Sequence, residues 1–368
     1  MRLALLVPLL LALALPLEAR EVDLTIVAVG DVAMNRTLEK VHPDGILLWG
    51  KVSPFSKMTD GIQRYINKKN LNFLNLETTL TDSNDNPPEE KAYNFRSHPN
   101  SVKHLLKVGF NLFGFANNHA QDYGAKGIKD TRRWLDELGA GKDFWYAGAG
   151  EDLDQASDPV VFKFKGLRIA FAAVANGRAA TQHRAGVASV HSPDLTLRKL
   201  REARADIRIL SMHSGTERKS TPDAVQRNTA RRAIDKYKVD LVIGHHPHVV
   251  QGVERHGRGL IIYSLGNFMC RGCRDMGSVR ELRGERDFGF LARLSLRYDK
   301  KARKLTFRKL EALPVYDMHS GPHPFKKQED ADLRIEVLNR LSADLVDGKQ
   351  PPVVFEADDG KYVHRFKD

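Results

Sequence analysis

The regular alternation of two sequence patterns most constrains how this chain can fold. Short apolar runs rich in β-branched and aromatic residues predict strands, and they cover residues 24–29, 71–76, 111–115, 167–174, 207–212, 241–243 and 260–263. Amphipathic patterns between several of these runs predict helices at residues 101–108, 127–138, 194–203 and 223–237. Strands that alternate with helices are typical of a layered α/β domain. The sequence therefore predicts the α/β class, with sheets flanked by helices.

The C-terminal part of the chain departs from this alternation. Two long strand-like runs at residues 288–298 and 304–315 flank the turn-prone Asp299-Lys300-Lys301 and predict a hairpin that closes the sheet. Beyond Tyr316 the chain becomes polar and then offers one helix, at about residues 329–345. We therefore expect a main domain over residues 20–318 and a helical appendage over residues 319–368.

The first residues predict export from the cytoplasm. Arg2 precedes an apolar run of 15 residues at positions 3–17, and Glu18-Ala19-Arg20 follows it. A positive start, a short apolar stretch and a small residue near the cut are typical of a secretory signal peptide, here over residues 1–19 with cleavage near Ala19. The run is shorter than the ~20 residues of a membrane-spanning helix, so a retained membrane anchor is the alternative. We expect the mature protein in the periplasm or the cell envelope.

Composition narrows the class of protein and the partners. Hydrophobic residues make up 42% and charged residues 28% of the chain, which excludes a wholly disordered protein. The net charge of +12 favours anionic partners. The only cysteines, Cys270 and Cys273, exclude a disulfide-rich scaffold and a four-cysteine zinc module. For this Cys-x-x-Cys pair three interpretations remain possible: a local disulfide, two unreactive thiols and a redox pair.

Polar residues follow the predicted strands almost at once, and this pattern points to function. Sites in layered α/β folds form beyond the carboxyl ends of the strands. Six predicted strands lead into such residues: Gly30-Asp31, Asn75-Leu76-Glu77, Asn117-Asn118-His119, His213, His245-His246-Pro247-His248 and Ser264-Leu265-Gly266-Asn267. Each of these alone has an ordinary explanation as a turn, a helix cap or a solvated acid. Together they predict a metal site where the strand ends meet.

The residue types in this set indicate which metals and which chemistry to expect. Carboxylate, amide oxygen and imidazole without thiolate suit Mn, Fe, Zn or Ni. One Asp, one Glu, one Asn and three His are enough for two divalent ions that share a carboxylate. Two ions ~3.5–4 Å apart hold the attacking and leaving oxygens of an in-line displacement and lower the pKa of a bridging water. A histidine beside the ions, such as His119, would protonate the leaving group.

These residues, in this order, resemble the CapA family, which is named for capsular poly-γ-glutamate synthesis proteins. The resemblance extends over about residues 27–268. It is carried by Gly30-Asp31-Val32-Ala33-Met34, Asn75-Leu76-Glu77-Thr78, Phe95-Arg96-x-x-Pro99, Ala116-Asn117-Asn118-His119 with Asp122-x-Gly124, His213-x-Gly215-x-Glu217, Gly244-His245-His246-Pro247-His248-Val249 and Tyr263-Ser264-Leu265-Gly266-Asn267-Phe268. It implies the calcineurin-like metallophosphoesterase fold, a layered β-sandwich flanked by helices with four α/β/β/α layers.

The resemblance also implies roles for individual residues. Glu77 is the candidate bridge between two ions, and the implied metal ligands as a set are Asp31, Glu77, Asn118, His213, His246 and His248. His119 is the implied acid, and Arg96 would grip an anionic substrate with its planar guanidinium or form a surface ion pair. Residues implied to support the ligands from behind are Asn117, Glu217 and Asn267. For Glu217 a solvated loop acid is the alternative.

Three positions differ from related patterns. Ala33 stands where typical metallophosphoesterases carry a histidine, and Asn75-Leu76-Glu77 stands where they carry Gly-Asp. Both differences resemble the CapA pattern. Ser214 stands where the CapA family usually has an aromatic residue, so we expect one wall of the pocket to differ.

The resemblance implies an exported, metal-dependent, hydrolase-like protein of poly-γ-glutamate or related capsule or envelope polymer biosynthesis. In this hypothesis metal-bound hydroxide attacks a phosphoester or a glutamyl amide. A non-catalytic, metal-stabilised binding subunit of a polymer synthesis or export complex is one alternative, and a periplasmic phosphodiesterase is another. The expected partners are an anionic polymer or phosphoester substrate and a membrane polymer-synthase complex. Nucleic acid is not expected, because the sequence shows no aromatic stacking platforms.

Overall fold

The computed structural model describes residues 20–35, 40–48, 50–270, 288–346, 348 and 350–367. The predicted signal peptide, residues 1–19, and Cys273 lie outside the described residues. Cys270 is buried at the end of strand β17 (Asn267–Cys270). In the described part of the chain, none of the helices has the length and hydropathy of a membrane-spanning segment.

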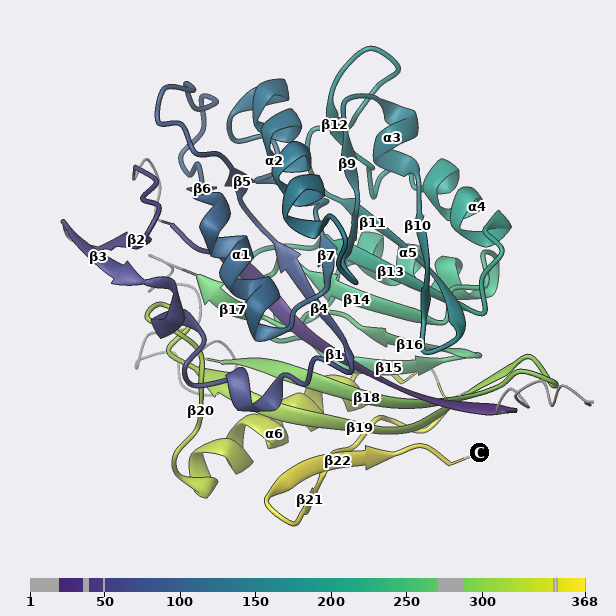
Figure 1. Cartoon of the computed structure of the whole chain (residues 1–368). Coiled ribbons are helices and arrows are strands. Elements are labelled where there is room, and N and C mark those ends of the chain that lie inside the picture. Colours follow the sequence, from purple (N-terminus) through teal and green to yellow (C-terminus); the bar gives the residue numbers. More distant parts are fainter. Residues whose placement is uncertain are drawn as a thin grey trace, which may run out of the picture.

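The first sheet is built around the long strand β1 (Glu21–Ala33), as Figure 1 shows. On one side of β1 the strands run parallel, in the order β4 (Leu71–Leu76), β7 (Leu112–Gly114) and β8 (Trp145–Ala147). On the other side they run antiparallel, in the order β18 (Gly289–Asp299), β19 (Lys304–Tyr316), β22 (Lys361–Arg365) and β21 (Glu356–Asp358). β17 pairs with the end of β1, and β20 (His323–Pro324) pairs with β19.

The second sheet has a parallel centre and antiparallel edges. Its order is β10 (Val160–Phe164), β11 (Leu167–Ala175), β13 (Ile207–His213), β14 (Leu241–His245), β16 (Gly259–Ile262) and β15 (Val253–His256). Its central strands are buried on both faces, which explains why they read as continuous apolar runs rather than alternating ones.

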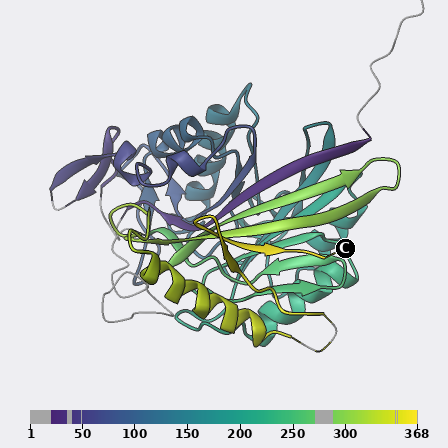
Figure 2. The same cartoon turned by 90° about the horizontal axis from the view of Figure 1, so that it is seen from below.

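The two sheets pack face to face and helices cover their outer faces (Figures 1 and 2). Phe73 of the first sheet meets Phe171 of the second edge-to-face, with ring centroids 5.8 Å apart. Helices α1 (Pro99–Val108) and α2 (Gly124–Gly139) join the core of the first sheet, and α4 (Asp194–Glu202) and α5 (Ala224–Asp235) share a second apolar cluster with the outer face of the second sheet. The predicted α/β class and its four α/β/β/α layers are confirmed.

Shorter elements connect these layers. They are β2 (Gly45–Leu48), β3 (Lys51–Pro54), η1 (Phe55–Met58), η2 (Gln63–Tyr65), β5 (Thr79–Leu80), β6 (Arg96–Ser97), β9 (Ala149–Gly150), α3 (Leu153–Ser157) and β12 (Gly186–Val187).

Three strands that carry predicted site residues run further than the sequence pattern indicated. β1 continues through Asp31, because β17 takes over as its partner, with Asp31 opposite Asn267. The Asp31 N–H donates to the Gly266 carbonyl at 3.1 Å. Gly30 permits this approach, since a Cβ there would lie 1.8 Å from the same carbonyl oxygen. β13 and β14 likewise include His213 and His245. These side chains therefore project from rigid strands rather than from the loops that follow.

The C-terminal segment does more than add a helix. The predicted hairpin is present as β18 and β19, but it lies inside the first sheet, because β22 pairs with the far side of β19. Helix α6 (Gln328–Ala343) falls where the sequence predicts one and packs against β15 and β19. The sequence pattern did not predict the short strands β20, β21 and β22, of which β21 forms the edge of the sheet beyond β22. The domain division at residue 318 stays a prediction.

Candidate metal centre

The carboxyl ends of strands from both sheets meet at one buried place and bring most of the predicted site residues together. Asp31 comes from β1, Glu77 follows β4 directly, and His213 ends β13. His246 and His248 follow β14. None of these side chains belongs to a residue that is more than 7% exposed. Parallel strands point their carboxyl ends the same way, so residues far apart in sequence converge here.

Asp31 is held from two sides. The Asn75 side chain donates from Nδ2 to Asp31 Oδ1 at 2.8 Å, and the His246 backbone N–H donates to Oδ2 at 3.2 Å. Three imidazole nitrogens lie 3.4–3.6 Å from its carboxylate, from His213, His245 and His248. Burial by itself would raise the pKa of Asp31, but these histidines outweigh it and hold the pKa well below its usual range. Asp31 is therefore an ionised carboxylate in the interior.

Glu77 makes no side-chain hydrogen bond within the described part of the chain. Both of its carboxylate oxygens are buried, and neither has a hydrogen-bond partner among the described residues. Its closest basic atoms are Nε2 of His213, His248 and His119, which lie 3.4, 3.8 and 3.9 Å from Oε1. Burial, and after it the charge of Asp31, raise the pKa of Glu77 well above its usual range. A buried carboxylate without a partner is costly, and a cation bound beside it would remove that cost.

Three sets of donor atoms in this cluster are close enough together to hold an ion. In each set the atoms lie within 4.8 Å of one another, and the sets are Glu77 with His213 and His246, Asp31 with Glu77 and His248, and Glu217 with His246 and His248. Glu77 belongs to two of them, which is compatible with the predicted bridging role. Carboxylate oxygens and imidazole nitrogens fit Mn, Fe, Zn or Ni. The residues present therefore fit a bound divalent metal.

The His246-Pro247-His248 turn is backbone that the surrounding fold holds in an uncommon conformation. His246 has φ +94° and His248 has φ +59°, both in the left-handed region. Such residues cost about 1–3 kcal/mol each and are found at functional sites. His248 is fixed by its Nδ1–H, which donates to Asn267 Oδ1 at 2.9 Å. The turn thereby aims two imidazoles at the carboxylates.

The protonation of the histidines follows from burial and from their neighbours. Burial lowers the pKa of His213 to about 4 and that of His246 to about 2, so both rings are neutral and can serve as ligands. Burial also acts to lower the pKa of His248, but the Glu77 and Asp31 carboxylates outweigh it and raise the value to about 10. Asn118 Oδ1 lies 2.8 Å from His213 Nε2, which places the predicted amide ligand against a predicted imidazole ligand.

His119 lies at the edge of the cluster and is oriented by an acid. Its Nδ1 is 2.7 Å from Asp122 Oδ2, and the Lys91 ammonium forms an ion pair with the other oxygen of Asp122. Lys91 also donates to the Asn118 carbonyl at 2.8 Å. The Phe95 ring packs on the imidazole, with centroids 4.2 Å apart. Burial lowers the pKa of His119, and Asp122 partly offsets this.

The other predicted residues are placed as follows. Asn117 braces the loop, since its Nδ2 donates to the Leu76 carbonyl at 2.7 Å and its Oδ1 accepts from the His119 N–H at 3.1 Å. Glu217 is exposed, yet it reaches the imidazoles of the His246 turn. Arg96 donates from Nη1 to the Asn84 carbonyl at 3.1 Å and lies over the Tyr123 ring at 5.2 Å. Its role as a substrate grip stays a prediction, as do the ligand roles of the whole set.

The sequence patterns included Asn75, His245 and Asp122 but predicted no role for them, and the fold brings all three to the site. His245 is fully buried, and neither of its ring nitrogens has a hydrogen-bond partner among the described residues. Its place in the His-His-Pro-His run was a signal that could have included it. The signal for Asp122 was its place three residues after His119, in the same motif. The signal for Asn75 was its place two residues before Glu77.

Comparison with known proteins finds a family model and relatives whose names agree with one another. The family model described as "Bacterial capsule synthesis protein PGA_cap" matches residues 25–271. The "Capsule biosynthesis protein CapA" of Bacillus anthracis is 32% identical over 267 residues, which are 69% of this chain and 62% of that relative. The "PGA biosynthesis protein CapA" of Bacillus subtilis is 33% identical over 252 residues, 66% of this chain and 62% of that relative. The chain thus aligns with about 62% of the length of both relatives.

Solved structures with a related arrangement are more distant. A novel phosphatase of Mycoplasma pneumoniae superposes with a TM-score of 0.46 at 14% identity, covering 80% of this chain and 94% of that chain. A 5'-nucleotidase from Candida albicans superposes with a TM-score of 0.42 at 12% identity, covering 86% of this chain and 58% of that chain. The fold assignment rests on the sheet order and layers described above.

Proposed function

The chain belongs to the family of bacterial capsule synthesis proteins, and we propose that it is an exported, metal-dependent hydrolase of capsule or envelope polymer metabolism. The proposed substrate is poly-γ-glutamate or a related anionic polymer, cleaved at a glutamyl amide or a phosphoester. The names of the two Bacillus relatives, which refer to capsule and PGA biosynthesis, support the polymer part of this proposal. A membrane polymer-synthase complex is the proposed partner.

One observation carries the catalytic part of the proposal. Glu77 is buried, and neither of its carboxylate oxygens has a hydrogen-bond partner among the described residues, in the middle of a cluster that also supplies Asp31 and neutral imidazoles. A group needed only for folding would be satisfied by hydrogen bonds, as buried polar groups nearly always are. We infer that Glu77 is kept for two divalent ions, which when bound would polarise the scissile group and lower the pKa of water.

The chain's own residues would supply the proton transfer. Asp122 accepts from Nδ1–H of His119, which leaves Nε2 of His119 facing the cluster, 3.9 Å from Glu77. Because burial lowers the pKa of His119, the ring is favoured in its neutral form. His119 would therefore take a proton at Nε2 from the attacking water and then give it to the leaving group.

The first experiment is elemental analysis of the purified full-length protein, reloaded with Mn or Zn. We expect about two equivalents of metal, and their loss in an Asp31→Ala/His246→Ala double variant. His183→Ala, which changes an exposed histidine, is the matched control and is expected to keep its metal. Failure of the wild-type protein to take up any metal after reloading would refute the proposal.

A second candidate function is a metal-stabilised binding subunit without turnover, and the depth of the site favours it. Asp31, Glu77 and His213 are completely buried, and the exposed fraction of His119 is only 6%. A large polymer would need an opening to reach these groups. A binding subunit would need the metal for its stability, but its polymer would not have to reach the metal.

His119→Ala separates the two functions. A hydrolase is expected to keep its metal and to lose about 10²–10⁴-fold in rate on a labelled poly-γ-glutamate or phosphodiester substrate. Asp122→Asn removes only the orienting charge, so a smaller loss is expected. Two results would favour the binding subunit. One is that metal-loaded wild-type protein turns over neither substrate class, and the other is that the His119→Ala variant complements a deletion strain.

A further inference from the structure

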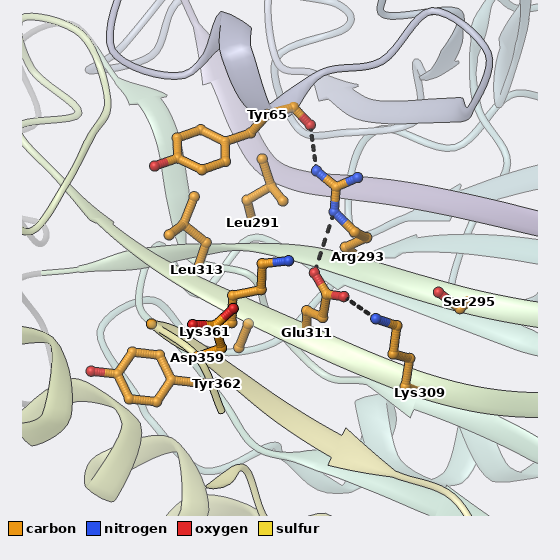
Figure 3. A pocket seen from close by; sticks show the side chains of 12 residues that line it. Tyr65, Leu291, Arg293, Ser295, Lys309, Glu311, Leu313, Asp359, Lys361 and Tyr362 are labelled. Atoms are coloured by element: carbon orange, nitrogen blue, oxygen red, sulfur yellow. Dashed lines mark hydrogen bonds and ion pairs between the residues drawn. The ribbon is translucent and has the colours of Figure 1, made fainter. Parts of the chain in front are cut away.

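A second candidate site lies on the outer face of the first sheet, away from the metal centre (Figure 3). It is a groove with a volume of about 560 Å³, within the ~300–1,000 Å³ range of small-ligand sites. Cross-strand pairs of β18 and β19 form its floor: Leu291 opposite Leu313, Arg293 opposite Glu311, and Ser295 opposite Lys309. Tyr65 of η2 forms one wall, and the β21–β22 turn with Lys361 and Tyr362 forms the other.

Two cations of the floor are held in place by one carboxylate. Lys309 Nζ lies 2.6 Å from Glu311 Oε1, and Arg293 Nε lies 3.5 Å from Glu311 Oε2. Arg293 also donates from Nη2 to the Tyr65 carbonyl at 2.7 Å, as Figure 3 shows. A single carboxylate cannot neutralise two cations, so the floor keeps one positive charge. Its position is fixed before any ligand arrives, which reduces the entropy lost on binding.

Lys361 adds a cation that the fold leaves available. Its side chain reaches over the floor from the β21–β22 turn (Figure 3), and its ammonium makes no ion pair or hydrogen bond within the described part of the chain. The wall that carries it is anchored, because the neighbouring Tyr362 hydroxyl donates to Asp332 Oδ1 at 2.6 Å and accepts from Gln328 Nε2 at 2.6 Å. Counting Asp359 as well, the groove holds three cations and two carboxylates.

We propose that this groove binds a short stretch of an extended, acidic chain that carries carboxylates at intervals, at a site separate from the metal centre. One carboxylate of such a chain pairs with Lys361 and another with the Arg293 and Lys309 cations. Its aliphatic segments lie on Leu291 and Leu313, between the charged positions. The floor of the groove carries both apolar and cationic side chains, with a single excess positive charge. This matches a chain of moderate negative charge density. The choice of a polycarboxylate rests on the proposed function.

The test is direct binding of a fluorescein-labelled poly-γ-glutamate oligomer to the full chain, followed by fluorescence anisotropy at low and at physiological salt. Lys361→Glu is expected to weaken binding at least tenfold while leaving the melting temperature unchanged, because the Lys361 ammonium has no partner to lose among the described residues. Lys163→Glu, the same charge reversal at an exposed lysine of β10 in the other sheet, is the matched control and is expected to stay within twofold of wild type. Equal binding by wild type and Lys361→Glu overturns the proposal.

Two further arms separate this site from the metal centre and from simple charge attraction. The Asp31→Ala/His246→Ala variant is expected to bind the oligomer as wild type does, whether or not the wild-type protein hydrolyses it. Binding lost in that variant places the chain at the metal centre and overturns the separate site. Inorganic polyphosphate is the comparison anion. If it binds as tightly and loses affinity equally in Lys361→Glu, the groove recognises negative charge in general and the polycarboxylate assignment is wrong.

Discussion

Two buried glutamates, Glu77 and Glu254, show how differently this molecule treats the same side chain. Glu254 of β15 is 6% exposed and fully satisfied. Arg231 donates from Nε to its Oε1 at 2.9 Å, and the Tyr263 hydroxyl donates to its Oε2 at 2.6 Å. Glu77 is 0% exposed and has no hydrogen-bond partner for either oxygen in the described part of the chain.

We interpret this difference as one between an acid that serves the fold and an acid that the proposed function keeps for a metal ion. Glu254 ties helix α5 to the edge of the second sheet through Arg231, so its contacts serve the fold. Glu77 is surrounded by side chains that could hold a metal ion with it, and its own pKa is raised by burial and by Asp31. A natural protein accepts such a local cost where function requires it. Substituting each glutamate is therefore expected to change stability in opposite directions.

Metal removal is expected to have the largest effect on stability. If metal is present at ~1,000 times its dissociation constant, chelation lowers the free energy of unfolding by about 4 kcal/mol. Chemical denaturation of metal-loaded and chelated protein measures this change. The drop is expected to persist in Glu254→Gln and to shrink strongly in Glu77→Gln. An equal drop in both variants would contradict the distinction between the two glutamates.

Glu254→Gln is expected to give the next largest effect. The substitution removes the charge that faces the partly buried Arg231, and loss of one member of such a pair is expected to cost about 2–3 kcal/mol here, less than for a wholly buried pair. Denaturation of the chelated variant measures it without the metal contribution. Glu137→Gln, at an exposed glutamate of α2 that pairs with Arg133, is the control and is expected to change stability by less than about 0.5 kcal/mol.

Metal affinity is expected to rise with pH. In the metal-free protein the charge of Glu77 raises the pKa of His248 to about 10, so the buried Glu77–His248 pair holds at least one proton near neutral pH. A metal must displace this proton, and each displaced proton raises the affinity about tenfold per pH unit below the corresponding pKa. Calorimetric titrations in buffers of different ionisation enthalpy count the protons. Release of none would contradict the protonation assigned to the cluster.

Glu77→Gln is expected to give the smallest effect, and one of opposite sign. Removing a buried acid that has no hydrogen-bond partner in the described part of the chain is expected to stabilise the chelated protein by about 1 kcal/mol. The raised pKa means that the folded protein keeps a proton that the unfolded chain releases above about pH 4.5. Wild-type stability therefore falls as pH rises above that value, and the gain in the variant grows between pH 5 and pH 8. A destabilised Glu77→Gln protein at pH 8 would show that Glu77 serves the fold as Glu254 does.

The sequence was sufficient for the elements whose periodicity is strong. The strands at residues 71–76 and 207–212 and the hairpin around Asp299 were predicted, because apolar residues must face the core at a fixed spacing. β22 was missed because it is short and about half of its side chains lie in solvent, so its apolar pattern is weak. The pairing that holds it comes from β19, about 50 residues earlier in the chain, and local pattern cannot indicate such a partner.

The sequence by itself determined which residue types stand at the strand ends, and from them it predicted that Asp31, Glu77, His213 and the His246 turn are metal ligands. Only the tertiary structure decided which of them are satisfied. Asp31 gains the Asn75 amide and the His246 N–H, whereas Glu77 gains neither. It also placed Asp122 beside His119 and brought Lys361 and Arg293 into one groove. Residue identity fixes what a side chain can bind, but hydrogen bonding and burial depend on neighbours that are distant in the sequence.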